Sequence, residues 1–363
     1  MKGVVRKRFA QRLLDWFDQH GRHDLPWQHP RSAYRVWISE VMLQQTQVKT
    51  VVPYFERFMQ RFPDVAALAT APLDDVLLLW AGLGYYARAR NLHRAAQQML
   101  AQHGGEVPQD FDALLQLPGL GRSTAGAILA QAHGARHAIL DGNVKRVLAR
   151  HAAIAEWPGH PNAAKQLWTI AESLLPQQRL ADYTQAIMDF GASLCTQRAP
   201  ACTRCPVNVD CRAFIRQDVA RFPAPRPRRE RPLRLASALL IENAEGEILL
   251  ERRPPVGIWG GLWCPPLLED GGDAATLLSE RYGLRLLSAV ALPRLRHAFT
   301  HFELELLPLR IRLDGAADTL RDCAGQRWVK LSDPLPALPA PVSKLLQRLK
   351  TSTDQPCPEP STA

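Results

Sequence analysis

The spacing of apolar positions divides the chain into two parts. Up to about residue 218, apolar residues recur every three or four positions, as in VWISEVML and LLLWAGL, which predicts amphipathic helices. Prolines at 53, 63, 72, 108, 118, 158 and 176 are expected to separate these helices. After residue 235 the period becomes two, so FELELLPLRIRL (302–313) predicts a strand and LASALLIENAEGEILLERR predicts a hairpin around Asn243 to Gly246. Residues 342–350 predict a closing helix.

These patterns predict a mainly α protein with a smaller α/β domain. The chain has 363 residues, which favours two domains. We expect a helical domain over residues 1–218, a linker over 219–234 (VARFPAPRPRRERPLR), an α/β domain over 235–350 and a disordered tail over 351–363.

The charge balance points to a polyanionic partner. The formal net charge is +10, which favours nucleic acid, although a basic surface also serves solubility. No apolar run is long enough to span a membrane, so we expect a soluble protein without a membrane partner. Seven cysteines without a signal peptide indicate a reducing compartment.

Four of the cysteines form a compact group. Cys195, Cys202, Cys205 and Cys211 are spaced C-x6-C-x2-C-x5-C, and four thiolates this close in sequence can surround one metal centre. Zinc or an iron–sulfur cluster would satisfy them. The spacing differs from the paired C-x2-C of zinc ribbons, and it resembles the 4Fe-4S loop of the endonuclease III family of DNA glycosylases.

The segment LPGLGRSTAGAILA (117–130) has the composition of a phosphate-binding turn. Two glycines let the backbone approach an anion closely, and the N–H groups at the start of the next helix can bind it. A helix-capping turn would explain Gly-x-Gly equally well on its own. Together with the cysteine loop, the segment resembles the helix-hairpin-helix of the same superfamily, which implies DNA contacts by Gly119, Gly121, Arg122 and Ser123.

Two carboxylates flank this segment. Glu40 lies in the largely apolar VWISEVMLQQTQV, where an unpaired charge is costly, and Asp141 lies in HAILDGNVKRVLAR, where a helix begins. Taken singly, each has an ordinary explanation, a salt-bridged helix residue and an N-cap. With the hairpin and the cysteine loop, they resemble the catalytic pair of the adenine DNA glycosylases of the MutY type. That resemblance extends from about Asp24 to Trp328.

The resemblance implies a fold, an activity and a partner. The fold is an all-helical helix-hairpin-helix glycosylase domain, with a six-helix barrel at about 23–134 and a terminal-helix and 4Fe-4S part at about 1–22 and 135–218. The activity is hydrolysis of the bond to adenine mispaired with 8-oxoguanine or guanine in double-stranded DNA, after base flipping. Glu40 would protonate adenine, and Asp141 would stabilise the sugar cation or capture it covalently. A monomer in the bacterial cytoplasm, associated with the nucleoid, is expected.

Further residues match the binding segments of that family. They are Gln44, Gln45, Leu83, Tyr85, Arg88, Asn143 and Lys145 for DNA, and Gln185 for the adenine pocket. Core packing for Tyr85, a solvated helix face for the glutamines and surface charge for the basic residues are the alternatives.

The second domain resembles the MutT-type Nudix fold, notably in VGIWGGLWCPPLLE. Active Nudix hydrolases need several glutamates that hold divalent cations, but the matching segment here is TLLSERYGL, which retains only Glu280. We therefore expect no diphosphatase activity. By resemblance the domain recognises 8-oxoguanine through Phe299, Thr300 and His301, with threonine where the family has serine.

Three other functions compete with this interpretation. A bifunctional glycosylase/lyase of the endonuclease III type needs an amine nucleophile after the hairpin, and position 123 is serine. A non-catalytic, zinc-containing DNA-binding protein would leave the surroundings of Glu40 and the second domain unexplained. A Nudix hydrolase with a helical anchor lacks the required glutamates.

Overall fold

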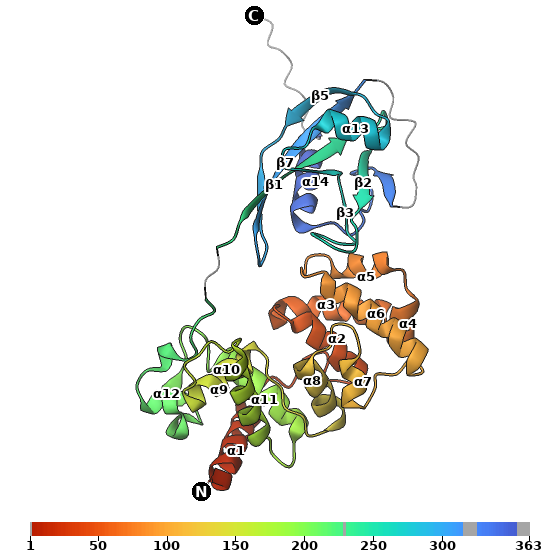
Figure 1. Cartoon of the computed structure of the whole chain (residues 1–363). Helices are drawn as coiled ribbons and strands as arrows, with labels where there is room; N and C mark the ends of the chain where they lie inside the picture. Colours follow the sequence, from red (N-terminus) through yellow and green to blue (C-terminus); the bar gives the residue numbers. More distant parts are fainter. Residues whose placement is uncertain (1, 228–229, 315–324, 354–363) are drawn as a thin grey trace, which may run out of the picture. The chain divides into compact units, whose positions relative to one another are not determined.

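The computed structural model describes residues 2–227, 230–314 and 325–353. The described chain forms two compact units (Figure 1). The first contains the residues up to 71 together with those from 88 to 227, and the second contains residues 72–87 together with the described residues from 230 onward. The tail expected at 351–363 lies, from residue 354 on, outside the described part of the chain.

The N-terminal part is helical, as its apolar spacing predicts. Its helices are α1 (Lys2–His20), α2 (Ala33–Leu43), α3 (Val48–Arg61), α4 (Val65–Thr70), α5 (Leu73–Trp80), α6 (Ala87–Gln102), α7 (Phe111–Leu115), α8 (Arg122–His133), α9 (Gly142–Ala152), α10 (Pro161–Ser173), α11 (Leu180–Ser193) and α12 (Arg212–Ile215). One expected boundary is wrong, because Pro53 lies inside α3. It is the sixth residue of the helix, so its missing N–H removes the main-chain bond that would go to residue 49, and the helix nevertheless continues to Arg61.

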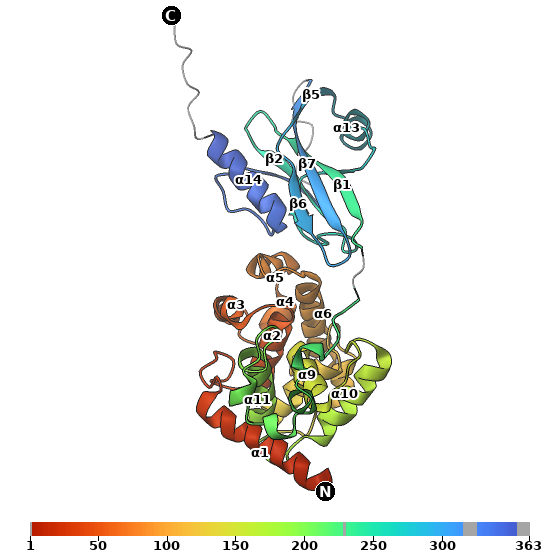
Figure 2. The ribbon, with the colours of Figure 1, turned by 90° about the vertical axis from the view of Figure 1, so that its left-hand side faces the viewer.

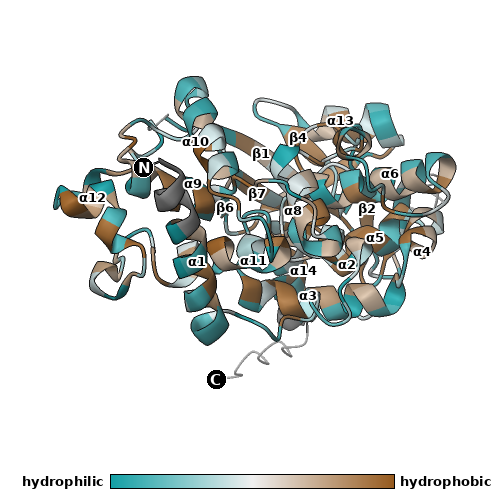
Figure 3. Cartoon of the chain, turned by 90° about the horizontal axis from the view of Figure 1, so that it is seen from below, coloured by the Kyte–Doolittle hydropathy of each residue, from teal (hydrophilic) through white to brown (hydrophobic). Residues whose placement is uncertain are grey.

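The first unit is held together by an apolar core around α11. Helix α1 packs along α11, and Figures 1 and 2 both show the two helices side by side. Phe9, Leu13 and Phe17 of α1 join Leu148 and Phe190 in one buried cluster. Figure 3 colours the described part of α1 both brown and teal, and its buried residues Phe9, Leu13 and Phe17 recur every four positions, so this part of the helix is amphipathic.

Helix α8 is built from small residues because other segments pass close to it. It packs on both α2 and α11. A Cβ at Gly126 would lie 2.5 Å from the carbonyl oxygen of Ala138, so only glycine lets the segment before α9 run against α8. The small residues of STAGAILA therefore bring α2, α8 and the start of α9 together.

The second unit contains two small sheets. Their strands are β1 (Leu233–Ile241), β2 (Ile248–Arg252), β3 (Trp263–Cys264), β4 (Leu267–Glu269), β5 (Leu286–Ala291), β6 (Leu295–Ala298), β7 (Glu303–Leu313) and β8 (Gln326–Val329). One sheet has the order β4-β1-β7-β5, with β6 also paired to β7, and the other has the order β3-β2-β8. Strands β1 and β7 are parallel, whereas the other pairs are antiparallel.

Besides α5, the described helices of this unit are α13 (Ala274–Tyr282) and α14 (Ala340–Thr353). Leu278 and Tyr282 of α13 pack on Leu239 and Ile311 of the first sheet. The strand at 302–313 and the closing helix are confirmed as elements by β7 and α14.

The hairpin expected around Asn243 is only partly present. The turn forms, since the Asn243 N–H donates to the Glu247 carbonyl at 3.0 Å, and a single bridge joins Glu242 to Ile248. Beyond the bridge, β1 and β2 enter different sheets, because β1 takes the distant strand β7 as its partner. The hairpin prediction is therefore wrong beyond the turn itself.

Candidate active site

Glu40 lies near the end of α2, which starts at the N-cap Ser32. Its carboxylate accepts a hydrogen bond from the amide nitrogen of Gln131 on α8, at 3.0 Å. The residue is half-buried, but protein surrounds its carboxyl group. Burial raises its pKa to about 7, the negative charge of Asp141 adds to this, and the Gln131 bond opposes it. Glu40 can therefore keep a proton near neutral pH.

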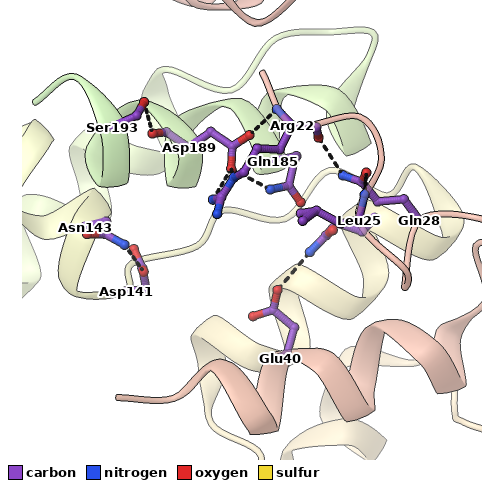
Figure 4. A network of polar contacts seen from close by, with 10 residues as sticks. Arg22, Leu25, Gln28, Glu40, Asp141, Asn143, Gln185, Asp189 and Ser193 are labelled. Carbon is purple, nitrogen blue, oxygen red and sulfur yellow. Dashed lines mark hydrogen bonds and ion pairs between the residues drawn. The ribbon is translucent and has the colours of Figure 1, made fainter. Parts of the chain in front are cut away.

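Asp141 caps α9, and its carboxylate accepts from the Val144 N–H at 2.7 Å. Burial raises the pKa of this carboxyl, while main-chain hydrogen bonds and the charges of Arg146 and Lys145 oppose the rise. Figure 4 shows Glu40 and Asp141 in one network of polar groups. The site thus holds two carboxyl groups in different surroundings, one bonded to a neutral amide and one near cations.

Asn143 and Arg146 connect Asp141 to the cysteine loop. The Asn143 amide donates to the Asp141 carboxylate at 3.4 Å, and Arg146 donates to the Asn143 amide oxygen at 2.9 Å. Arg146 also donates to the Cys195 carbonyl at 2.9 Å. Lys145, the other basic residue of this turn, lies in the first turn of α9.

The two glycines of the turn before α8 differ in how much space surrounds their backbone. Gly119 has φ +82°, and a Cβ there would lie 2.9 Å from Cβ of Asn91. Gly121 caps α8, and nothing lies within 4 Å of the place a Cβ would take. An anion can therefore reach the start of α8 at Gly121.

The next two residues have protein partners. Arg122 lies over the Trp168 ring at 4.0 Å and is paired with Glu172, so α10 holds its guanidinium. Ser123 accepts a hydrogen bond from the Leu140 N–H at 3.0 Å. Because Leu140 precedes Asp141, the serine ties the hairpin helix to the segment that carries the second carboxylate.

Arg88 binds the end of α2. It is buried, and its guanidinium donates to the carbonyls of Val41, Met42 and Gln44 at 2.9, 2.8 and 2.5 Å. These carbonyls end α2 without helical partners, and a buried cation satisfies them. Arg88 thus has protein partners in this structure, and its expected phosphate contact stays a prediction.

The segment that Arg88 supports has an unusual backbone. Gln44 is the C-cap of α2 and bonds weakly to Thr124 at 3.5 Å, and Gln45 has φ +60°. In the loop before α6, Tyr85 has φ +49° and is half-exposed, whereas Leu83 is buried. Strained backbone of this kind is concentrated at functional sites.

Gln185 lies on α11 and is buried, and its amide nitrogen donates to Asp189 at 2.7 Å. Asp189 in turn binds Arg22. Sequence reasoning missed Gln131, Asp189 and Arg22. The signal for the first two is a lone polar residue within an apolar helix, in AILAQAH and AIMDFG, as with Glu40.

The four cysteines gather around one pocket and are free thiols. Arg150, only 4% exposed, lies beside them, and it donates to the Cys195 sulfur at 3.4 Å and to the Thr196 carbonyl at 2.6 Å. Among the described residues no three His, Cys, Asp or Glu side chains are close enough to hold one metal ion. Four thiols around one pocket are the kind of residues that could hold a metal centre.

In the second unit, Thr300 and His301 form the tip of the β6–β7 turn. The Phe299 N–H donates to the Phe302 carbonyl at 2.9 Å, and the two rings stack with centroids 4.5 Å apart. The bond and the stacked rings therefore fix the base of the turn, and Thr300 and His301 at its tip are exposed.

Helix α13 carries the segment that the resemblance aligns with the metal-binding helix of active Nudix enzymes. Arg281 of α13 binds the buried carboxylate of Glu251 at 3.0 Å. A guanidinium thus neutralises a carboxylate beside the helix on which active Nudix enzymes carry glutamates. None of the helices in the described ranges is long and apolar enough to cross a bilayer.

Comparison with known proteins agrees with this arrangement. Residues 38–173 match the HhH-GPD superfamily of base excision DNA repair proteins, and residues 237–348 match the NUDIX domain. The chain is 38% identical to the adenine DNA glycosylase of Buchnera aphidicola subsp. Acyrthosiphon pisum, over 94% of this chain and 97% of the relative. It is 35% identical to the adenine DNA glycosylase of Homo sapiens, over 88% of this chain and 70% of the relative.

A solved thymine-DNA glycosylase superposes with a TM-score of 0.54 at 28% identity, covering 59% of this chain and 98% of that one. An endonuclease III–DNA complex, at 22% identity and a TM-score of 0.51, shares the fold over 60% of this chain and 98% of that one. The protein is therefore a base excision DNA repair glycosylase, with a helical HhH-GPD domain followed by a Nudix-like α/β domain.

Within that class, the chain belongs to the adenine DNA glycosylase family of base excision repair, which are hydrolases of N-glycosyl bonds. The resemblance stated from the sequence motifs is thereby confirmed, and DNA is the substrate.

Proposed function

We propose that this protein is a monofunctional glycosylase that removes adenine mispaired with 8-oxoguanine or guanine. The observation that carries the proposal is the pair of carboxyl groups, with the pKa of Glu40 raised to about 7 beside Asp141. Adenine is a poor leaving group as an anion, so a proton must reach it as the bond to the sugar breaks. An acid with a pKa near the working pH is best suited to this transfer.

The two carboxyl groups divide the work. Glu40 delivers the proton to the flipped adenine, because its surroundings favour the neutral acid. The sugar then gains positive charge, which the Asp141 carboxylate stabilises or captures, as the second carboxylate does in glycoside hydrolases. Asn143 and Lys145 orient and stabilise that carboxylate, since both lie in the turn that Asp141 caps.

Water, not an amine, completes the reaction. A lyase step needs an amine that forms a Schiff base with the sugar. Ser123 occupies the position after the hairpin where the lyase relatives have lysine, and its oxygen is bonded to the Leu140 N–H. The expected product is an intact strand with an abasic site.

DNA contacts come from both units. The backbone at Gly119 and Gly121 receives a phosphate, while Gln44, Gln45 and Tyr85 enter the groove where the adenine has left the stack. Phe299, Thr300 and His301 recognise the opposing 8-oxoguanine. The cations near these segments make binding salt-dependent.

The cysteine pocket holds a 4Fe-4S cluster. Cys195, Cys202, Cys205 and Cys211 supply the thiolates, and Arg150 stabilises their negative charge. When bound, the cluster fixes the loop next to α9, to which Arg146 is bonded. Brown purified protein with broad visible absorption supports this assignment, and colourless protein containing stoichiometric zinc contradicts it.

The catalytic assignment is tested with Glu40→Gln and Asp141→Asn. Both variants should bind an A:8-oxoguanine duplex and excise adenine far more slowly than wild type. Glu56→Gln, an exposed glutamate on α3, is the matched control and should retain wild-type rates. Normal turnover by either active-site variant would contradict the catalytic assignment.

Lesion recognition is tested at the β6–β7 tip. Thr300→Ala and His301→Ala should reduce the preference for A:8-oxoguanine over A:G while leaving the rate on A:G similar. Unchanged discrimination in both variants would refute this role.

A further inference from the structure

Asp189 is a buried carboxylate with no role in the proton transfer described above. It lies on α11, is 2% exposed, and sits one helical turn after Gln185. Arg22, in the loop between α1 and α2, donates to it from the main-chain N–H at 2.8 Å and from Nε at 2.9 Å. A buried charge is retained in a protein when it is paired and hydrogen-bonded in this way.

The loop that carries Arg22 is itself fixed by side-chain amide bonds. The Leu25 N–H donates to the Gln28 side-chain oxygen at 3.1 Å, and the Gln28 amide nitrogen donates to the Arg22 carbonyl at 3.0 Å. Arg22 is thus held on its carbonyl side by Gln28 and on its N–H side by Asp189. Asp189 cannot move without breaking several of these bonds.

The carboxylate determines which way the Gln185 amide faces. An ionised carboxylate only accepts hydrogen bonds, so the amide nitrogen of Gln185 has to face Asp189, at the observed 2.7 Å. The amide oxygen then lies on the opposite side. Figure 4 shows Gln185 between Asp189 and the region of Glu40, with its nitrogen turned toward Asp189.

This orientation selects a hydrogen-bond donor on the base. Adenine has an amino group at position 6, which donates, whereas guanine and hypoxanthine have an oxygen there, which accepts. We propose that Asp189, anchored by Arg22, is a positioning residue that fixes the Gln185 amide so that its oxygen meets the 6-amino group of adenine. The inference rests on the proposed function, because it assumes that the base enters beside Glu40.

The test compares two bases in the same sample. Duplexes with adenine or hypoxanthine opposite 8-oxoguanine, carrying different fluorophores, are mixed, and single-turnover rates are measured together. In Asp189→Asn the new amide can donate or accept a hydrogen bond, so the side-chain amide of Gln185 can rotate to the opposite orientation. The ratio of the adenine rate to the hypoxanthine rate should fall by about five- to ten-fold, the effect of one hydrogen bond.

A ratio measured in one sample does not depend on the fraction of folded protein, so a merely structural defect leaves it unchanged. Asp18→Asn is the matched control, because Asp18 of α1 pairs with Arg179 at the start of α11 on the surface. This variant should keep the wild-type ratio. An equal fall in the control would overturn the inference.

A reversed pair keeps the inference testable if Asp189→Asn does not fold. In Gln185→Glu with Asp189→Asn, the donor and acceptor are exchanged, and the carboxylate at position 185 again offers an oxygen to adenine. The double variant should recover most of the wild-type ratio.

The outcomes separate the inference from the function on which it rests. Wild-type protein that leaves adenine in place contradicts the proposed function. Wild-type protein that excises adenine, with an unchanged ratio in Asp189→Asn or no recovery in the reversed pair, contradicts only the role of Asp189.

Discussion

Glu40 should make the folded protein less stable at high pH, and Glu40→Gln should remove that dependence. Its pKa is raised from the usual 4.5 to about 7 by burial and by the charge of Asp141. Raising a pKa over this interval corresponds to about 3 kcal/mol of differential stabilisation of the protonated form. The variant keeps an amide of nearly the same shape that is neutral at every pH.

The pH window follows from the direction of the pKa change. Below about pH 4.5 the carboxyl is protonated in both the folded and the unfolded state, and it has no effect on the pH dependence. Between 4.5 and 7 the folded state holds the proton while the unfolded state has lost it, so stability falls as pH rises. Above about 7 the full 3 kcal/mol is lost.

Thermal unfolding of wild type and Glu40→Gln at pH 5 and pH 8 measures this difference. Since part of the effect is already lost at pH 5, about 2.5 kcal/mol separates the two pH values, and the variant should gain about 5–10 °C in Tm relative to wild type over this interval. Glu56→Gln, exposed on α3, should follow wild type. Parallel Tm curves for Glu40→Gln and wild type would refute the buried, proton-holding state of Glu40.

Three further predictions follow from single contacts. Gly119→Ala should lower the free energy of unfolding by about 1–3 kcal/mol because φ is +82°, whereas Gly121→Ala should fold normally and weaken DNA binding at the open turn; equal effects on stability would contradict this. Ser123→Ala should cost about 1–3 kcal/mol, measured by denaturant unfolding, since the Leu140 N–H loses its acceptor. Arg88→Gln should lower the free energy of unfolding by about 2–3 kcal/mol and slow adenine excision, while the salt dependence of DNA affinity changes little. A changed salt slope with unchanged stability would instead support a direct phosphate contact.

The division into a helical and a mixed part, and the two carboxylates, could be predicted from the sequence. Apolar periodicity is local, so a window of a dozen residues predicts α2 or β7. Glu40 and Asp141 could be recognised because each lies in a distinctive segment. The DNA and lesion contacts stay predictions, since the structure contains no nucleic acid.

Contacts between distant segments could not be predicted in this way. Gln131 and Glu40 are 91 residues apart, and Arg22 and Asp189 are 167 apart, so no local pattern connects them. Arg88 is buried although arginine usually lies at the surface, because its hydrogen bonds to the carbonyls at the end of α2 offset the cost of its burial. The pairing of β1 with the distant strand β7, and not with the next strand β2, could not be predicted from local patterns either.

One incubation tests most directly whether this protein removes adenine opposite 8-oxoguanine by hydrolysis. Duplexes with A:8-oxoguanine, A:G or thymine glycol are treated with the protein, and strand breakage is compared with and without hot alkali. We predict breaks only after alkali, and only in the adenine strand. Breaks without alkali, or cleavage at thymine glycol, would contradict the account.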